Sequence, residues 1–328
     1  MRGWSCNNML YPWQESLWQN WQQLLEQKRL HHAILLLAVK GSGRDVLARQ
    51  LAKTVLCQNN ETEPCDVCHS CKLFEANSHP DFHVIKPEQE GKQIGVDAVR
   101  QCNRWATETS HLNGQRVILI EHADVMGEAG SNAILKTLEE PPQGCQFILT
   151  AQSLDSLLPT IVSRCNKWRL PIPAEANVKQ WVEHKLMQSI NVESIRLNSG
   201  APLSTLAFVE SGMNIRHANL IKAFAEFLQP PNIGIYDVTA MCTADGIITL
   251  KWLSYFLVDC IKYQQGVSNS FVHNESLVAV QQVATQVSGA LLLEQSRKIN
   301  TLYRKLEQHT GLNIELLVVE WLTGFIQD

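Results

Sequence analysis

The chain has 328 residues, of which 45% are hydrophobic and 18% are charged, a length that predicts two or three domains rather than one core. Its net charge of −4 argues against a protein that grips nucleic acid alone through a broad basic face. Because it has no apolar run of the roughly 18 residues that a membrane helix requires, and no signal-peptide core at its N-terminus, we expect a cytoplasmic protein that contacts no membrane.

The first informative elements are a strand, a glycine-rich turn and a helix. Residues 33–37 (AILLL) indicate a buried strand, and residues 45–56 (DVLARQLAKTVL) have helical spacing. The turn between them is the setting of a phosphate-binding loop of the form G-x-x-x-x-G-K-[ST], in which backbone N–H groups and a lysine bind phosphate while a hydroxyl binds Mg²⁺. Gly41 and Gly43 are retained, but Ala38 replaces the first glycine.

The two chemically decisive positions of this loop are altered. Arg44 occupies the lysine position, and a planar guanidinium is not equivalent to a compact ammonium group. Asp45 occupies the position of the hydroxyl. A carboxylate about 4 Å from a phosphate oxygen costs on the order of 4 kcal/mol at an effective dielectric constant of 20. We therefore predict a turn that keeps its shape, with Asp45 near the helix start, and no ATP bound by this chain.

Four of the ten cysteines follow as C-x7-C-x2-C-x2-C in the segment VLCQNNETEPCDVCHSC. Thiolates two residues apart can face one metal ion, and four of them fill a tetrahedral zinc shell. Since nothing in the sequence indicates secretion, a metal is favoured over disulfides. We predict a structural Zn²⁺ held by Cys57, Cys65, Cys68 and Cys71, with free thiols or a redox pair as alternatives. His69 is interpreted as a turn residue.

Strand and helix signals then alternate along the chain. Strands are indicated at residues 82–85 (FHVI), 116–124 (RVILIEHAD) and 145–151 (CQFILTA), and helices at residues 96–106 and from residue 127 to the Pro-Pro pair that ends LEEPP. Strands separated by helices predict a parallel sheet covered by helices on both faces.

The second of these strands ends in a motif that also departs from an ATPase pattern. In P-loop ATPases an aspartate there orders the Mg²⁺ shell and a following glutamate acts on the attacking water. Here Glu121 occupies the position of the aspartate and His122 that of the glutamate. Because a histidine cannot serve as the same base, we interpret His122 as a cleft histidine. Together with the altered loop, this predicts a degenerate nucleotide site.

Several motifs occur in the order found in one known family: LYPWQ, HHAILL, HPDFHVIKPE with IGVDAVR, NAILKTLEEPP, FILT and TIVSRC. With the degenerate loop and the four-cysteine insert, residues 10–170 resemble the AAA+ clamp-loader family of bacterial DNA polymerase III. The C-terminal part matches in helical character and in the phrase GLNIELLVVEWL. The ATP-hydrolysing gamma subunits of that family keep the lysine and the hydroxyl, so the resemblance implies a subunit that does not hydrolyse ATP.

The resemblance also implies a fold. It is an α/β AAA+-type P-loop domain with a parallel sheet, followed by a small helical lid domain and an all-α collar domain. We expect the first domain at residues 1–172, with the zinc-binding insert at 57–71, the lid at 173–213 and the collar at 214–328. The collar segments carry wide apolar stripes at helical spacing, whose first role is core burial.

A role for one arginine comes from the same resemblance. In the family, the arginine of the SRC motif reaches into the ATP site of a neighbouring subunit, and such a trans arginine is worth about 10³ to 10⁵ in rate in GTPases. Here it is Arg164, which Ser163 would position through a backbone contact and Cys165 through packing. The alternative is a surface arginine in a local ion pair.

The implied function is that of a non-hydrolysing subunit in a pentameric loader, which places a ring-shaped sliding clamp on primed DNA as part of a DNA polymerase holoenzyme. Its partners would be the gamma/tau and delta subunits, with the clamp and the DNA contacted through the assembly. We expect no catalysis from the isolated chain. Two alternatives remain: an active gamma-type ATPase, in which Arg44 and Glu121 substitute for lysine and aspartate, and a zinc-ribbon scaffold that binds nucleic acid.

Overall fold

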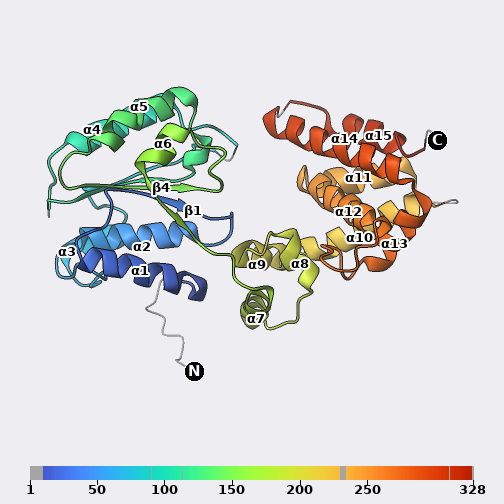
Figure 1. The fold of residues 1–328 in the computed structure, drawn as a ribbon, viewed down its shortest axis with the longest axis horizontal. Helices are drawn as coiled ribbons and strands as arrows, with labels where there is room; N and C mark the ends of the chain where they lie inside the picture. Colours follow the sequence, from blue (N-terminus) through green and yellow to red (C-terminus); the bar gives the residue numbers. More distant parts are fainter. Residues whose placement is uncertain (1–9, 90, 113, 230–233, 310, 327–328) are drawn as a thin grey trace. The chain divides into compact units, whose positions relative to one another are not determined.

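The computed structural model describes residues 10–89, 91–112, 114–229, 234–309 and 311–326. The chain divides into two compact units, Met1–Pro173 and Ala174–Asp328. The first unit contains a sheet with helices, and the described part of the second is entirely helical (Figure 1). The further division of the second unit near residue 213 stays a prediction.

The first unit is built on a five-stranded sheet with the order β2-β3-β4-β1-β5, in which every neighbouring pair is parallel. The carboxyl ends of parallel strands meet at one edge of a sheet, which is where ligand sites occur in such folds. The turns after β1 and β3 therefore flank the end of β4. The strands are β1 (Ala33–Leu37), β2 (Phe82–Ile85), β3 (Arg116–Ile120), β4 (Cys145–Ala151) and β5 (Asn166–Arg169).

Helices cover both faces of this sheet. Helices α1 and α2 lie on one face, and α4, α5 and α6 lie on the other (Figure 1). The helical elements of the first unit are η1 (Pro12–Gln14), α1 (Glu15–Glu26), α2 (Arg44–Leu56), α3 (His69–Glu75), α4 (Val96–Thr107), η2 (Ala123–Val125), α5 (Glu128–Glu139) and α6 (Pro159–Arg164).

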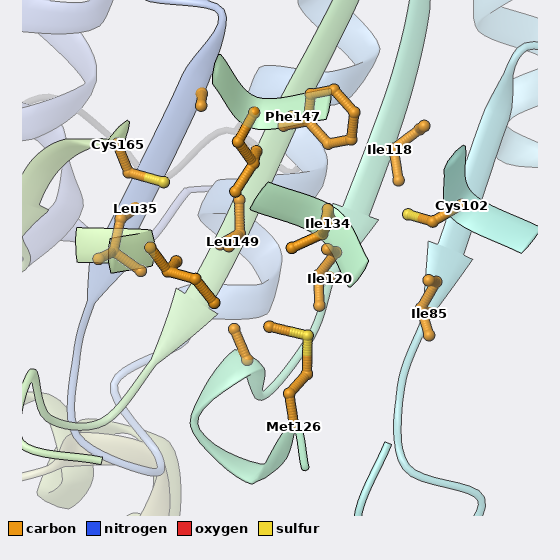
Figure 2. Packing of buried hydrophobic residues seen from close by; sticks show 14 of the residues in the cluster. Leu35, Ile85, Cys102, Ile118, Ile120, Met126, Ile134, Phe147, Leu149 and Cys165 are labelled. Atoms are coloured by element: carbon orange, nitrogen blue, oxygen red, sulfur yellow. The ribbon is translucent and has the colours of Figure 1, made fainter. Parts of the chain in front are cut away.

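The two hydrophobic cores of this unit follow from the alternation of side chains along each strand. In β1, Leu35 belongs to the core under α4 and α5, whereas Ile34 and Leu36 belong to the core under α1 and α2. Figure 2 shows the first of these cores, where Leu35 and Leu149 of adjacent strands lie near Ile134 of α5. A strand buried on both faces needs apolar residues at every position, which explains the continuous run AILLL.

One predicted boundary is wrong. The strand signal at residues 116–124 ends as a strand at Ile120, and the 3₁₀ turn η2 follows. The backbone N–H of Glu121 still donates to the carbonyl of Ile85, at 2.8 Å. His122 then adopts a left-handed conformation with φ of 60°. A residue in this region cannot continue a strand, so the chain turns at His122.

The second unit packs around the long helix α12, which contacts α10, α11, α13 and α14. Its described helices are α7 (Glu175–Leu186), α8 (Val192–Leu197), α9 (Pro202–Glu210), α10 (Met213–Phe227), α11 (Ile235–Ala244), α12 (Ile248–Gln264), α13 (Leu277–Gln286), α14 (Gly289–Gln308) and α15 (Ile314–Thr323). Within the described residues no helix is long and apolar enough to cross a membrane. The predicted fold class is confirmed in that an α/β domain with a parallel sheet is followed by helical structure.

Candidate functional site

The glycine-rich turn connects β1 to α2 at the carboxyl edge of the sheet. Gly41 and Gly43 have φ angles of 81° and 78°, in the left-handed region that glycine adopts without strain. A Cβ atom at Gly43 would lie 2.6 Å from the ring of Tyr11 and 2.9 Å from the side-chain nitrogen of Gln14. Glycine is thus required at position 43 both by the backbone angle and by close packing.

The segment at the start of η1 covers this turn. Gln14 is fully buried, and its amide donates to the carbonyls of Ser42 and Gly43 at 3.3 and 2.7 Å. The indole N–H of Trp13 donates to the Ser42 carbonyl at 2.8 Å. These contacts fix the turn from residues almost 30 positions earlier in the chain. Both residues belong to the motif LYPWQ, but the motif did not indicate that they contact the turn.

Arg44 fills the inside of the turn. Its side chain is only 3% exposed, and its Nη1 donates to the carbonyl of Ala38 at 3.1 Å. Its Nη2 donates to Nδ1 of His122 at 2.7 Å, because a guanidinium has donors only and the imidazole nitrogen must accept. Its Nε lies 3.7 Å from the carboxylate of Asp45. The residue in the lysine position therefore bonds the protein itself.

The acidic motif is also engaged by the protein. The carboxylate of Glu121 lies 3.7 Å from Nη2 of Arg49 on α2. The backbone N–H of His122 donates to the hydroxyl of Thr150 at 3.1 Å, and Thr150 is fully buried on β4. The structure thus brings the two degenerate motifs together: Arg44 is hydrogen-bonded to His122, and Arg49 forms an ion pair with Glu121. Neither Arg49 nor Thr150 was assigned a role from the sequence, because each contacts a residue far away in the chain, although Thr150 belongs to the motif FILT.

This arrangement has a clear chemical consequence. Phosphate binding in such a turn needs free backbone N–H groups and a lysine that extends to the phosphate, and Mg²⁺ needs oxygen ligands. Here the cation at position 44 is turned back onto Ala38 and His122, and the acid at position 121 faces an arginine. These contacts stabilise a closed turn rather than a magnesium site.

The four cysteines of the insert come together between α2 and α3. Their sulfur atoms all lie within 4.8 Å of one another. Backbone N–H groups of Cys65, Cys68 and Cys71 donate to the sulfurs of Cys57, Cys65 and Cys68 at 3.3 to 3.4 Å. Hydrogen bonding, first from the backbone of Val67, lowers the pKa of Cys65 to about 6, which favours a thiolate.

This donor set fits zinc. Four sulfurs around one Zn²⁺ at about 2.3 Å would be separated by about 3.8 Å, which is compatible with the observed cluster. His69 is exposed as the first residue of α3 and is not part of the cluster. The insert is tied to α2 by Lys53, which is 3% exposed and pairs with Asp66 at 2.6 Å and also with Glu75.

Arg164 is the last residue of α6, and only Cys165 separates it from β5. Its Nη1 donates to the carbonyl of Thr160 at 3.0 Å, and its Nη2 donates to the carboxylate of Glu139 at 2.9 Å. The Ser163 hydroxyl also donates to Thr160, at 3.1 Å, and Cys165 is buried in the core. The resemblance implied a backbone contact for Ser163 and packing for Cys165; that these two residues position Arg164 stays a prediction.

Glu139 is the unexpected residue at this position. It is the last residue of α5, where the helix dipole disfavours a negative charge. The pair is partly exposed, with 28% of the Arg164 side chain and 59% of the Glu139 side chain accessible. Exposed pairs of this kind contribute about 1 kcal/mol or less, so the guanidinium can leave Glu139 at little cost. The local ion pair considered as an alternative for Arg164 is present in the isolated chain.

Comparison with known proteins gives a consistent result along the chain. The family model "DNA polymerase III, delta subunit" matches residues 13–173, and "DNA polymerase III, delta subunit, C terminal" matches residues 210–327. The chain is 31% identical to DNA polymerase III subunit delta' of Haemophilus influenzae, over 97% of this chain and 98% of that protein. It is 34% identical to the subunit delta' of Yersinia pestis, over 96% and 95% of the two chains. The chain therefore belongs to the family of DNA polymerase III delta-prime subunits, within the clamp-loader group that its sequence motifs indicated.

Proposed function

We propose that this chain is the non-hydrolysing delta-prime subunit of a cytoplasmic clamp loader. It helps to place the sliding clamp on primed DNA, together with gamma/tau and delta subunits, and it contributes Arg164 to the ATP site of a neighbouring gamma subunit. The observation that carries this proposal is the closed nucleotide turn, in which Arg44 bonds Ala38 and His122. We also propose the division of the helical unit into a lid at residues 173–213 and a collar at residues 214–328.

The closed turn favours a non-hydrolysing subunit over an active gamma-type ATPase. A gamma-type ATPase would need Arg44 to leave both of its partners and extend to a phosphate, and it would need Glu121 to leave Arg49 for Mg²⁺. Even then Asp45 would face the phosphates where a hydroxyl is needed. Several interactions would therefore have to be lost before the first ligand contact is gained.

The position of Arg164 supports its role in a neighbouring site. A trans arginine must be held at a surface, must keep its charge and must be free to move onto a phosphoryl group. Arg164 is anchored at its backbone by buried Cys165, while its guanidinium rests on the exposed carboxylate of Glu139. ATP bound between two subunits then contacts both of them, so the nucleotide state biases their relative orientation.

The zinc-ribbon alternative has less support. A nucleic-acid-binding ribbon presents cationic side chains to the phosphate backbone. Here the buried Lys53 beside the cysteine cluster is paired with Asp66 and Glu75. These contacts attach the insert to α2, as expected of a structural zinc module.

Replacing Arg164 by alanine tests the trans role. The sharpest assay uses a loader in which the gamma subunit beside this chain carries the only intact phosphate-binding loop. Arg164→Ala should lower ATP turnover at that site by about 10³-fold, because the charge that stabilises the transferring phosphoryl group is lost. Clamp-stimulated ATPase measured at saturating ATP gives the effect on turnover rather than on binding.

The matched control is Arg169→Ala, which removes an exposed arginine at the end of β5. It should leave turnover unchanged, and both variants should assemble with gamma and delta to the same size as the wild type. Unchanged ATPase in a correctly assembled Arg164→Ala loader would refute the trans role, while leaving the family assignment intact.

Restoring the loop residues tests whether Arg44 closes the turn. The isolated wild-type chain should show no measurable binding of Mg·ATP by calorimetry. The double variant Arg44→Lys with Asp45→Thr removes the guanidinium from Ala38 and His122 and supplies the missing ammonium and hydroxyl groups. We expect it to bind Mg·ATP at least about tenfold more tightly than the wild type.

The single variant Asp45→Thr is the control for position 45. It removes the acid and supplies the hydroxyl but leaves Arg44 in the turn, so it should bind Mg·ATP more weakly than the double variant. Tight Mg·ATP binding by the wild-type chain, equal to that of the double variant, would show that Arg44 does not close the site.

Metal removal tests the cysteine cluster. The purified chain should contain about one zinc ion, since four sulfurs complete one tetrahedral shell. Cys71→Ser should lose this zinc and make the segment between α2 and α3 sensitive to limited proteolysis, because the metal is its main cross-link. Cys242→Ala, at a buried cysteine of the helical unit, should keep the zinc. A wild-type chain that is purified under metal-replete conditions without zinc would contradict the assignment.

A further inference from the structure

A chain of four buried titratable side chains runs through the helical unit. Glu193 lies on α8, His217 on α10, Asp259 on α12, and His273 in the connection between α12 and α13. None of the four is more than 3% exposed. Buried charge is unfavourable unless it is neutralised or hydrogen-bonded, so the protonation of this group is tightly constrained.

The four side chains form three consecutive contacts. His273 Nδ1 lies 2.8 Å from the carboxylate of Asp259. The Nε2 atoms of His273 and His217 are 3.2 Å apart. His217 Nδ1 lies 3.3 Å from Oε1 of Glu193. The order is therefore carboxylate, imidazole, imidazole, carboxylate, and both ring nitrogens of each histidine face a member of the chain.

Counting protons along this chain leaves one missing. Two of the contacts are hydrogen bonds, and the third brings a ring nitrogen and a carboxylate oxygen to 3.3 Å, so one hydrogen is needed in each of the three. Two neutral imidazoles carry one N–H each, and ionised carboxylates carry none, which gives two hydrogens for three contacts. If His273 donates to Asp259 and His217 donates to His273, then Nδ1 of His217 and the carboxylate of Glu193 face each other as two acceptors.

We propose that Glu193 supplies the missing hydrogen: it is protonated at neutral pH, donates from Oε1 to Nδ1 of His217, and so completes a latch that joins α8 to α10 and α12. In this state the only charges of the chain are Asp259 and its partner Lys262, whose Nζ donates to Asp259 at 2.9 Å. The chain and its counter-ion are then neutral as a group, which is the arrangement that a buried site favours.

The protonation equilibria point in the same direction. Burial raises the pKa of Glu193, although the electrostatic influence of His273 and hydrogen bonds from Ser276 and the backbone of Glu275 oppose it. Burial lowers the pKa of His217 to about 3, so its imidazole stays neutral. For Asp259, burial alone would raise the pKa, but hydrogen bonds from His273 and Lys262 outweigh it and hold the pKa below its usual value.

The surroundings leave Oε1 of Glu193 able to carry the proton. The backbone N–H groups of Glu275 and Ser276 both donate to the other oxygen, Oε2, at 3.0 and 3.2 Å. The Ser276 hydroxyl, 3.1 Å from Oε1, can bond the second lone pair of that oxygen. On the same helix, Arg196 is directed away into a two-point pair with Glu175 and does not neutralise Glu193.

Aromatic rings close the rest of the site. Trp252 meets His217 edge to face at a centroid distance of 5.3 Å, and Phe256 meets His273 in the same way at 5.4 Å. With apolar rings against both imidazoles, a water molecule that supplied the hydrogen instead would find few polar partners on these sides.

A metal ion is the other way to join two acceptors. Glu193, His217 and His273 offer three ligand atoms within 4.8 Å of one another. However, Glu193 faces Nδ1 of His217, whereas His273 faces Nε2 of the same ring. One ion cannot use both nitrogens of one imidazole, and the Glu193 oxygens already accept from two backbone N–H groups and a hydroxyl. The geometry therefore favours a proton.

The latch has a structural consequence within the helical unit. Glu193 accepts from the residues that precede α13, and Arg196 of the same helix α8 donates to the carbonyl of Phe271 in the same connection. The short helix α8 is thus tied by its polar side chains to α10, α12 and the connection after α12. Loss of the Glu193 proton would place an uncompensated carboxylate against His217 and loosen this attachment.

The test compares the full-length chain with Glu193→Gln by urea unfolding at several pH values. A glutamine amide supplies the missing hydrogen covalently, so this variant should fold and keep the three contacts. A protonated Glu193 stabilises the native chain fully below the pKa of the unfolded carboxyl, and this contribution disappears as the pH rises to the pKa of the folded one. The ratio of unfolding constants, wild type over Glu193→Gln, should therefore rise about tenfold per pH unit between about pH 5.5 and about pH 7.5.

The matched control is Glu275→Gln, an exposed neighbour with the same change of charge. The ratio of the wild-type unfolding constant to that of Glu275→Gln should stay constant with pH. Infrared absorption of the wild-type chain gives a readout that needs no stable variant: a protonated carboxyl C=O band should be present at neutral pH and should persist in Glu275→Gln. Absence of that band, a flat ratio for Glu193→Gln, or a second zinc ion bound at His217 and His273 would overturn the proposal.

Discussion

The hydrogen bonds of the Arg44 guanidinium are the constraint on which the functional interpretation depends. A glycine-rich turn between a strand and a helix presents N–H groups that attract an anion. A chain that binds no anion there must hold the turn in place through its own contacts. Here Arg44 bonds the carbonyl of Ala38 and the imidazole of His122, while Gln14 bonds the carbonyls of Ser42 and Gly43. These bonds are made to carbonyl oxygens of the turn, so the turn is held in its shape by side chains of the protein itself.

The same contacts explain why two altered motifs occur in one chain. With aspartate and glutamate at positions 121 and 122, a magnesium site would remain beside an arginine that cannot reach a phosphate. With histidine at position 122, an acceptor lies 2.7 Å from the arginine, and Glu121 lies near the second cation, Arg49. His122 thus provides an acceptor for Arg44, and Arg49 provides a cation for Glu121, at the carboxyl edge of the sheet. The residues that replace the nucleotide-binding groups of this site therefore interact with one another.

The sequence could predict features that depend on neighbouring residues, but not contacts between residues far apart in the chain. The strand Ala33–Leu37 and the helix Glu128–Glu139 were predictable because apolar periodicity and a Pro-Pro stop are local signals. The end of β3 was not, because it depends on the left-handed backbone of His122, which Thr150 of another strand helps to fix. Gln14, Arg49 and Glu139 act on residues at least 25 positions away. Gln14 and Glu139 lie within quoted motifs, LYPWQ and NAILKTLEEPP, but neither a period nor a motif shows which distant residue a side chain contacts.

The two units use buried polar groups for a common purpose. Replacing a buried polar pair with apolar residues often preserves or increases stability, so such pairs are better understood as fixing geometry. Lys53 places the cysteine insert on α2, and the chain from Glu193 to Asp259 places α8 on the neighbouring helices. In each case a small element with few apolar residues of its own is held by directional bonds, because hydrophobic contact alone would allow it to slide or rotate. Arg164 differs from Lys53 because its own side chain is partly exposed, at 28% against 3%. The insert and α8 are held by ion pairs and hydrogen bonds of buried side chains, whereas Arg164, proposed to act on a neighbouring subunit, is held by a partly exposed ion pair.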